Sequence, residues 1–518
     1  MCIRDRNKHR AYFAAQVRHW VAALDGADQL QSIRCLETDL GNVRAARHAA
    51  ANQHEYDEAC ELLEGLCRLF VWRGRYQEGE TLCRQALGDR PEDAPTGQRV
   101  RLLTWHGLFL RNLGETRGAL RRFEAALALA QPRSPDAADL YLPDAQAFAL
   151  LEYARALLDV DRVRSRAAAE ECLALYRSMA SASGEAQARC ILAGLDFKVS
   201  DYQSSGEQAA QSLAIALRLH DRRVEATALE MLAMVRVAQG NLADSEDLIR
   251  RSVALFQSLG DEPNAIDALH MLAAQMIYSG EFATGKRLLV EAAEAARQNG
   301  AIGQYASLAE TLGWALINLG EYSDARPHIE LVRGVMADTG DPRGLALADL
   351  ALAEIDLADG RYAAADARLA RSAAAFLAMQ QHDEYVIATA ERVLALRGLG
   401  KTTAACALLT EITPQAASIA AFAPAQFVIA AHVLLLIDAG DVEAALELYA
   451  TVAEHPYFAR SRYRFDTVGK WVAEVERSRS ATQCAAIQVC GRQRDPVAAL
   501  RHAEAIMSAG NGQPLLQA

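Results

Sequence analysis

Apolar positions recur along this chain with a fixed period of about 40 residues, which is typical of repeat proteins. The clearest marker is glycine, which stands at positions 240, 280, 320, 360, 400 and 440. We name these the turn positions and extend them backward through Ser200, a degenerate copy near Asp161, and Gly114 and Gly74. The ninth position after each of them is almost always apolar: Cys83, Phe123, Ala209, Ile249, Leu289, Ile329, Leu369, Leu409 and Tyr449. The chain is therefore predicted to be built from copies of one unit.

A second glycine series divides each repeat into halves. Glycines at 260, 300 and 340 lie midway between turn positions, and Asp261 and Asp341 directly follow two of them. Glycine commonly ends a helix, and aspartate commonly caps the next one. Each half is therefore predicted to be a helix of about 16–17 residues followed by a short turn.

Two columns of mostly small residues predict how the paired helices meet. The fifth position after each turn position is occupied by Gly79, Ala119, Ser205, Ser245, Gly285, Ala325, Ala365, Ala405 and Ala445. The seventh position before it is occupied by Cys67, Gly107, Ala193, Ala233, Ala273, Gly313, Ala353, Val393 and Val433. Small side chains at a crossing let two antiparallel helices approach closely, and stacked copies bury a continuous core. We therefore predict an all-α solenoid of helix hairpins.

The pattern suggests four regions. Residues 1–50 are expected to form a helical linker, whose first six residues resemble translated vector sequence and imply a longer parent protein. Repeats are predicted over 51–130 and continue over 131–456, with the proline-rich stretch from Pro132 to Pro143 as a longer loop. Residues 457–518 carry nine Lys or Arg against five acids, and we expect solvated capping helices and a flexible tail.

Composition narrows the classes of protein. The 518 residues are 51% apolar with a formal charge of −12, which disfavours disorder and direct nucleic-acid binding. The ten cysteines are scattered, with no C-x-x-C pair, which suggests a reducing, cytoplasmic location without metal sites. The apolar stretch 419–437 contains Pro424, Gln426 and His432 and fits the repeat register, so we interpret it as a buried helix and expect no membrane contact.

Catalytic and nucleotide-binding motifs are weak. The segment from Gly280 to Arg287 matches a phosphate loop except that arginine replaces its Ser or Thr. Gly398–Thr403 has only the tail of such a loop, because Ala395 stands where the first glycine belongs. Both coincide with turn positions after helices, whereas a working phosphate loop follows a strand. We therefore predict no enzyme activity, no catalytic residues and no cofactor.

The repeats resemble the tetratricopeptide repeat (TPR). In LGWALINLGEYSDA, Leu312, Gly313, Gly320, Tyr322 and Ala325 fall at the spacing of that family. The period differs, since it is about 40 residues here and about 34 residues in the family. The resemblance implies a right-handed superhelix.

Repeats with long helices are similar to the sensor region of bacterial STAND-type regulatory ATPases, including the maltotriose-responsive activator and LuxR-type and antibiotic-regulator relatives. Residues 9–88 look like the segment that joins the ATPase and winged-helix parts of those proteins to their repeats. The resemblance implies signal transduction and transcription regulation, with an upstream ATPase module as a partner.

Groove positions of the TPR family, carried over to this chain, are the tenth, sixth and second positions before each turn position. They nominate Glu230, His270, Tyr278, Glu310, Trp314 and Asn318 as a ligand or partner groove. Aromatic rings beside carboxylates suit a peptide, a cationic group or a small inducer. The alternative is that Trp314 packs between repeats and the carboxylates face water. For the whole chain, we expect an effector-binding sensor, with a free-standing scaffold for protein assembly as the alternative.

Overall fold

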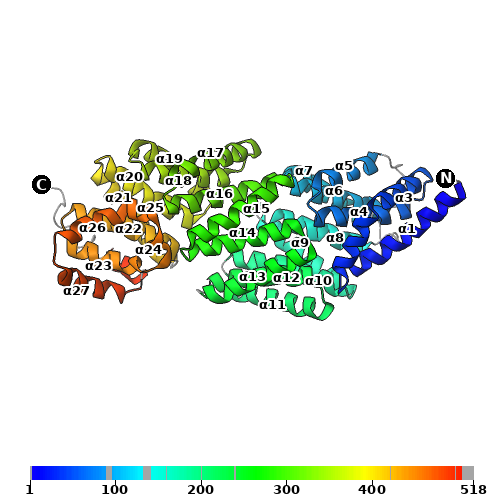
Figure 1. The fold of residues 1–518 in the computed structure, drawn as a ribbon, viewed down its shortest axis with the longest axis horizontal. Coiled ribbons are helices and arrows are strands. Elements are labelled where there is room, and N and C mark those ends of the chain that lie inside the picture. The colour runs from blue at the N-terminus through cyan, green and yellow to red at the C-terminus, as the bar shows by residue number, and fades with distance from the viewer. Residues whose placement is uncertain are drawn as a thin grey trace. The chain divides into compact units, whose positions relative to one another are not determined.

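The computed structural model describes residues 3–88, 96–131, 142–158, 160–199, 201–238, 241–419, 422–495 and 497–503. All regular structure in these residues is helical (Figure 1). The expectations for Ser200, Gly240, the loop around Pro132 and Pro135, the first two residues and the tail beyond 503 fall outside this part.

Helices α4 to α23 form consecutive antiparallel hairpins at the predicted period. In chain order they are α4 (Tyr56–Trp72) with α5 (Tyr76–Gly88), α6 (Thr96–Asn112) with α7 (Thr116–Ala130), α8 (Pro143–Leu157) with α9 (Arg162–Ser178), α10 (Ala182–Lys198) with α11 (Tyr202–Leu219), α12 (Arg222–Ala238) with α13 (Leu242–Leu259), α14 (Glu262–Tyr278) with α15 (Phe282–Gln298), α16 (Ile302–Leu319) with α17 (Tyr322–Thr339), α18 (Pro342–Ala358) with α19 (Tyr362–Ala378), α20 (His382–Gly398) with α21 (Thr402–Ile419), and α22 (Phe422–Asp438) with α23 (Val442–Ala453). This repetition confirms the predicted α-solenoid of helix hairpins.

Shorter elements flank the hairpins. Before them come α1 (Ile3–Ala23), α2 (Gln29–Thr38) and α3 (Leu40–Asn52), and after them α24 (Pro456–Arg460), α25 (Arg462–Arg464), the π-helical turn η2 (Phe465–Gly469), α26 (Lys470–Arg477) and α27 (Ala481–Arg492). Within the apolar stretch 419–437, Ile419 is the last residue of α21 and residues 422–437 belong to α22. Among the described helices, none combines the length and the apolar character needed to cross a bilayer.

The punctuation of the helices follows the two glycine series. Gly280 and Gly320 have φ values of 76° and 79°, and Gly260 and Gly340 have φ values of 63° and 69°. These left-handed conformations end a helix without the strain that a Cβ atom would add. Asp341 accepts a hydrogen bond from the Arg343 backbone N–H at 2.9 Å and so caps α18.

The two small columns face each other inside the hairpins. The Ser205 hydroxyl donates to the Ala193 carbonyl oxygen at 2.9 Å, and a Cβ atom on Gly285 would lie 3.1 Å from the Ala273 oxygen. Ala365 is fully buried at the equivalent position. The predicted close crossing of paired helices is therefore confirmed at these positions.

The chain divides into two compact units. Unit 1 comprises residues 1–272 and 292–305, and unit 2 comprises residues 273–291 and 306–518, so the division runs through α14, α15 and α16. In unit 1 the turn after α4 meets the turn before α14: a Cβ atom on Gly74 would lie 3.4 Å from Pro263, and Arg73 donates to the Gly260 carbonyl oxygen. The hairpins of unit 1 thus wind back onto their own beginning.

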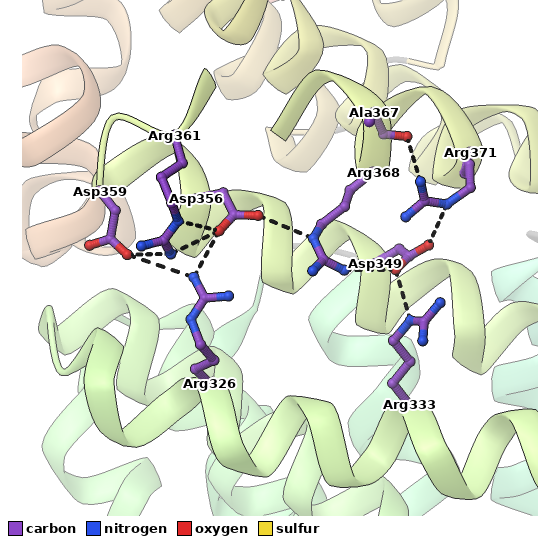
Figure 2. A network of polar contacts seen from close by, with 9 residues as sticks. All are labelled: Arg326, Arg333, Asp349, Asp356, Asp359, Arg361, Ala367, Arg368 and Arg371. Atoms are coloured by element: carbon purple, nitrogen blue, oxygen red, sulfur yellow. Dashed lines mark hydrogen bonds and ion pairs between the residues drawn. The ribbon is translucent and has the colours of Figure 1, made fainter. Parts of the chain in front are cut away.

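Ion pairs tie neighbouring hairpins together in unit 2. Two aspartates of α18, Asp349 and Asp356, lie at the centre of a cluster of arginines from α17, α19 and the turn before α19 (Figure 2). The side chain of Asp356 is only 2% exposed, and it holds Arg326 from the preceding hairpin at 2.8 Å and Arg368 from its own hairpin at 3.1 Å. Each aspartate therefore bridges two repeats.

Candidate functional site

A chamber of about 520 Å³ lies on the inner side of unit 1. Its wall is formed mainly by the first helices of the hairpins, α4, α6, α8, α10, α12 and the start of α14, and α2 contributes Gln29. The volume lies within the range of about 300–1,000 Å³ that is usual for ligand pockets. We refer to this space as the chamber.

The chamber follows a diagonal path across the helices. On α4 its wall uses Glu64, Arg68 and Trp72, which occupy the tenth, sixth and second positions before the turn position Gly74. On α14 it uses Pro263 and Asp267, which lie much further ahead of the turn position Gly280, near the start of the helix. Each repeat is rotated relative to its neighbour, so the inward-facing positions move toward the helix starts along the solenoid.

Charged side chains of both signs line the chamber. They are Asp25, Glu64, Arg68, Arg101, Arg111, Asp144, Glu152, Arg155, Asp221, Arg223 and Asp267. Many of them pair across adjacent hairpins: Glu64 accepts from Arg101 at 2.6 Å, and Arg101 also reaches Asp144. Because the walls carry both charges, the chamber suits a ligand that also carries both, such as a peptide with free ends.

Aromatic rings interleave with these charges. They are Trp72, Tyr76, Trp105, Phe148 and Tyr176. The Arg223 guanidinium lies 5.3 Å from the centre of the Trp72 ring, and Trp105 packs against Phe148 with ring centres 4.9 Å apart. The Trp105 Nε1 atom is buried, and no atom of the described residues accepts a hydrogen bond from it. A buried N–H without a partner is costly, so a ligand that brings an acceptor here gains affinity.

One carboxyl of the chamber titrates near neutral pH. Burial raises the pKa of Asp267 to about 6, and the neighbouring Asp261 acts in the same direction, while the hydrogen bond from Gln304 at 2.7 Å opposes the rise. Asp267 lines the chamber, so protein surrounds its carboxyl group while the group still contacts the solvent inside the chamber. Its charge therefore changes between pH 5 and pH 7.

The residues nominated from sequence fall in different surroundings. Glu230 is buried and accepts a hydrogen bond at 3.2 Å from Ser252 on α13, so it faces its partner helix and does not line the chamber. His270 is half-buried and likewise does not line the chamber, and burial lowers its pKa. At α12 and α14 the path runs about one turn earlier than the positions carried over from the TPR family.

The other nominated residues belong to unit 2. Tyr278 and Trp314 pack edge to face with ring centres 6.2 Å apart, so these two are brought together. Asn318 is buried, and its Oδ1 accepts from the Ser461 hydroxyl at 2.7 Å. Glu310 is half-buried, and burial raises its pKa to about 7. Their role in ligand binding stays a prediction.

Sequence reasoning missed one feature in each unit. Trp105, Arg111, Arg155 and Arg223 were not nominated, although regularly spaced charges on the first helices could have signalled them. The expectation that the basic residues after 456 are solvated is wrong for Arg464, which is only 1% exposed. It lies inside unit 2 because it pairs with Glu391 at 2.8 Å.

A scan against known protein families matches none, and no curated protein is similar in sequence. The solved structures similar to this chain include a Rap protein complexed with competence and sporulation factor, at 12% identity and a TM-score of 0.48, covering 76% of this chain and 99% of that one. The apo quorum sensor NprR from B. thuringiensis has 15% identity and a TM-score of 0.46, covering 70% of this chain and 98% of that one. A STAND protein with a tetratricopeptide repeat sensor from Pyrococcus horikoshii has 10% identity and a TM-score of 0.37, covering 61% of this chain and 49% of that one.

Proposed function

We propose that this chain is a non-enzymatic binding solenoid and that the chamber of unit 1 receives an oligopeptide. The observation that carries the proposal is the Trp105 Nε1–H. This donor lies buried in the wall of a chamber of about 520 Å³, and none of the described residues offers it an acceptor. A peptide backbone offers a carbonyl oxygen to such a donor at every residue. Its charged ends match the two signs of charge on the wall.

The pairing of the charges supports binding rather than chemistry. Glu152 is only 2% exposed and is held by Arg111 at 3.1 Å and by Arg155 at 2.6 Å. Ion-paired groups of this kind are fixed in place and suit the orientation of a ligand better than proton transfer. We therefore assign the chamber a recognition role.

The experiment is an affinity selection with free-ended hexapeptides. The full chain is incubated with an equimolar library, the retained peptides are identified by mass spectrometry, and each is resynthesised for calorimetry with wild type and with Trp105→Phe. The substitution keeps an aromatic ring against Phe148 and removes the donor. We expect affinity about 5–10-fold weaker, as for the loss of one hydrogen bond.

A matched variant separates this effect from a loss of structure. Trp20→Phe makes the same change at a partly buried tryptophan that does not line the chamber, and it should leave affinity unchanged. The unliganded Trp105→Phe chain should stay folded, because the loss of packing from the smaller ring is partly offset by the removal of a buried unpaired donor. Retention of no peptide, or equal affinity in wild type and Trp105→Phe, contradicts the proposal.

We further propose that the chain is the sensor part of a bacterial STAND-type regulatory ATPase involved in transcription regulation. The support is the likeness of residues 9–88 to the segment that joins the ATPase to the repeats in that group. Ligand binding would then favour one arrangement of the repeats and so change their contacts with the ATPase. A phosphate loop after a strand in the upstream genomic sequence is the expected result. A native start near His9 would favour the free-standing scaffold instead.

A further inference from the structure

A short segment of the chain runs along the inner side of unit 2. Residues 456–466 include α24, α25 and the start of η2, and α24 begins beside the turn between α14 and α15 (Figure 1). A Cβ atom on Gly280 would lie 2.4 Å from the Pro456 carbonyl oxygen, so only glycine permits this approach. Tyr457 then packs edge to face on Phe282, with ring centres 5.5 Å apart.

The middle of the segment is anchored by polar contacts to the first helices of two hairpins. Ser461 donates to Asn318 of α16 at 2.7 Å, and the Tyr463 hydroxyl donates to Glu391 of α20 at 2.6 Å. Both Ser461 and Tyr463 are only 2% exposed. The segment is therefore held mainly through its side chains.

Arg464 is the central anchor. Its Nη1 donates to Glu391 at 2.8 Å, and its guanidinium lies 3.8 Å from the centre of the Phe427 ring and 5.2 Å from that of Tyr463. A carboxylate together with aromatic faces is a favourable environment for a guanidinium group. The inner side of unit 2 therefore contains a built site for one arginine flanked by aromatic rings.

The path of the segment has the same register as the chamber. Each residue next to the segment can be counted back from the turn position of its own repeat. The residues are Gly280 at its turn position, Asn318 two positions before Gly320, Glu354 six before Gly360, Glu391 nine before Gly400 and Phe427 thirteen before Gly440. This movement toward the helix starts repeats the diagonal that the chamber follows in unit 1. The segment thus lies where the repeat geometry of unit 2 would place a ligand.

The contact is incompletely satisfied. The Nε and Nη2 atoms of Arg464 and the Oε2 atom of Glu354 are buried and have no hydrogen-bond partner among the residues that the structure describes. The segment begins with α24, a helix of only five residues that ends just before the extended Ser461, whereas the solenoid helices α18 and α20 have 17 residues. From Arg462 the chain stays helical through α25, η2 and α26. A helix of five residues gains little from backbone cooperativity, so the segment can begin to open at α24 without unfolding the hairpins.

We propose that the inner side of unit 2 is a recognition groove for a peptide with an arginine flanked by aromatic residues, and that residues 456–466 are its resident, exchangeable occupant. In the structure the groove is occupied by this segment. The partner that replaces it is a peptide that likewise carries an arginine flanked by aromatic residues. This groove is separate from the chamber of unit 1, so each proposal can fail without the other.

Residues 456–466 are covalently attached to the chain and compete with any free peptide for the groove. A segment on a short linker competes at an effective concentration in the millimolar range, so wild type should exclude a micromolar peptide. Removal of one partner of a buried charge pair weakens a contact by a factor of about 30 to several thousand. The Arg464→Ala chain should therefore release its segment and leave the groove free for a peptide that still carries the arginine.

The test uses a fluorescein-labelled peptide of residues 455–467 and fluorescence anisotropy with the full chain. Arg464→Ala is expected to bind the peptide saturably, with a dissociation constant of about 10–100 μM, whereas wild type shows no saturation at these concentrations. Binding should fall at least tenfold for Arg464→Ala/Glu391→Gln and for a peptide with alanine at the Arg464 position. Arg477→Ala removes an exposed arginine that donates to the Ala473 carbonyl oxygen of its own helix, and it should behave as wild type. No saturable binding to a helical Arg464→Ala chain overturns the proposal.

Hydrogen exchange on wild type keeps the proposal testable if Arg464→Ala does not fold. Amides of residues 457–466 should exchange at least tenfold faster than those in the middle of α18 and α20, because the segment opens on its own. Equal protection of the segment and these helices would show that it is a fixed part of the core and would overturn the proposal.

Discussion

Glu354 illustrates how unit 2 treats a single buried charge. Its side chain is only 2% exposed, and burial raises its pKa to about 8. The carboxylate of Glu391 acts in the same direction, while Arg464 and a hydrogen bond from Trp314 oppose the rise. One arginine is therefore shared by two glutamates, and the less closely paired one holds a proton at neutral pH.

This protonation predicts the pH dependence of stability. A carboxyl whose pKa is raised on folding binds a proton that the unfolded chain releases above about pH 4.5, so folding stability falls as pH rises from 4.5 to about 8. The slope is at most about 1.4 kcal/mol per pH unit. Glu354→Gln removes this titrating group. Between pH 5.5 and pH 7.5 the free energy of unfolding of the variant, measured with urea, should therefore rise relative to that of wild type. Glu330→Gln, at an exposed site, should follow wild type, and parallel curves for Glu354→Gln and wild type would contradict the assignment.

The same residue scale explains why glycine stands at one helix crossing. A Cβ atom on Gly313 of α16 would lie 2.1 Å from Cδ1 of Ile329 on α17, closer than two carbon atoms can approach. Residue 313 is in the middle of a helix, so glycine is not needed there to end the helix. It is needed because the neighbouring helix packs too closely for a side chain. The column of small residues thus marks the positions at which the two helices of a hairpin approach each other closely.

We expect Gly313→Ala to destabilise unit 2 by about 1–3 kcal/mol through overpacking. Ile329→Val removes Cδ1, the nearer of the two Ile329 atoms that the new methyl group would meet, and keeps Cγ1, so it relieves part of the clash. Alone it costs about 0.5–1.5 kcal/mol. The double variant should be more stable than the sum of the two single effects predicts, as measured by urea unfolding. Additive effects would show that the two side chains do not compete for the same space.

At the scale of elements, buried aspartates join one hairpin to the next. Asp356 accepts from Arg326 on α17, from Arg361 in the turn before α19 and from Arg368 on α19 (Figure 2). The arginine side chains are between 26% and 47% exposed, so water can solvate them if the aspartate is lost. The contact therefore resembles a half-buried ion pair rather than a fully buried one.

Asp356→Asn should reduce the free energy of unfolding by about 1–3 kcal/mol, less than the roughly 3–5 kcal/mol typical when a buried partner is left unpaired. Asp359→Asn provides the matched control, since Asp359 is 35% exposed and contacts two of the same arginines. It should cost less than about 1 kcal/mol. Equal effects of the two variants in urea unfolding would contradict the bridging role of Asp356.

Ala365→Arg tests the stacking of elements directly. Ala365 is fully buried, so an arginine there has neither space nor a partner, and we expect a loss of several kcal/mol. Because each repeat is stabilised by its neighbours, hydrogen exchange should increase over α18 to α21. An exchange pattern that stays unchanged outside α19 would argue against coupling between repeats.

At the scale of the whole molecule, contacts between distant repeats close unit 1. Gln29 of α2 is only 2% exposed and donates to Asp221, at the start of α12, at 2.7 Å. It also accepts from the backbone N–H of Arg222 at 3.1 Å. This contact joins residues 192 positions apart in sequence and forms part of the chamber wall.

Gln29→Ala should loosen this closure at a cost of about 1–3 kcal/mol, because Asp221 and the Arg222 N–H lose a buried partner. Hydrogen exchange should rise in α2 and at the start of α12, and peptide affinity in the chamber should fall. Gln31→Ala changes an exposed glutamine on the same helix and should have neither effect. Unaltered hydrogen exchange in Gln29→Ala would mean that other contacts are sufficient to keep α2 packed against the start of α12.

The sequence alone was sufficient to predict the hairpins, because each is defined by local interactions. Glycines such as Gly280 and Gly320 end helices through their own backbone freedom, and Ala193 and Ser205 meet within one hairpin. The apolar column at the ninth position after each turn follows from the same short-range pairing. These features recur in each copy of the repeat and can be read without knowing how the repeats wind.

The inner surface depends instead on the rotation from one repeat to the next. That rotation moves the inward-facing positions from Trp72 on α4 to Asp267 on α14, so no fixed column of the repeat marks the chamber, and Glu230 lies outside its wall. Winding also brings Gln29 to Asp221 and places Arg464 against Glu391, which the period of the repeat does not record. Small rotations accumulate over several repeats, and only the folded coordinates contain their sum.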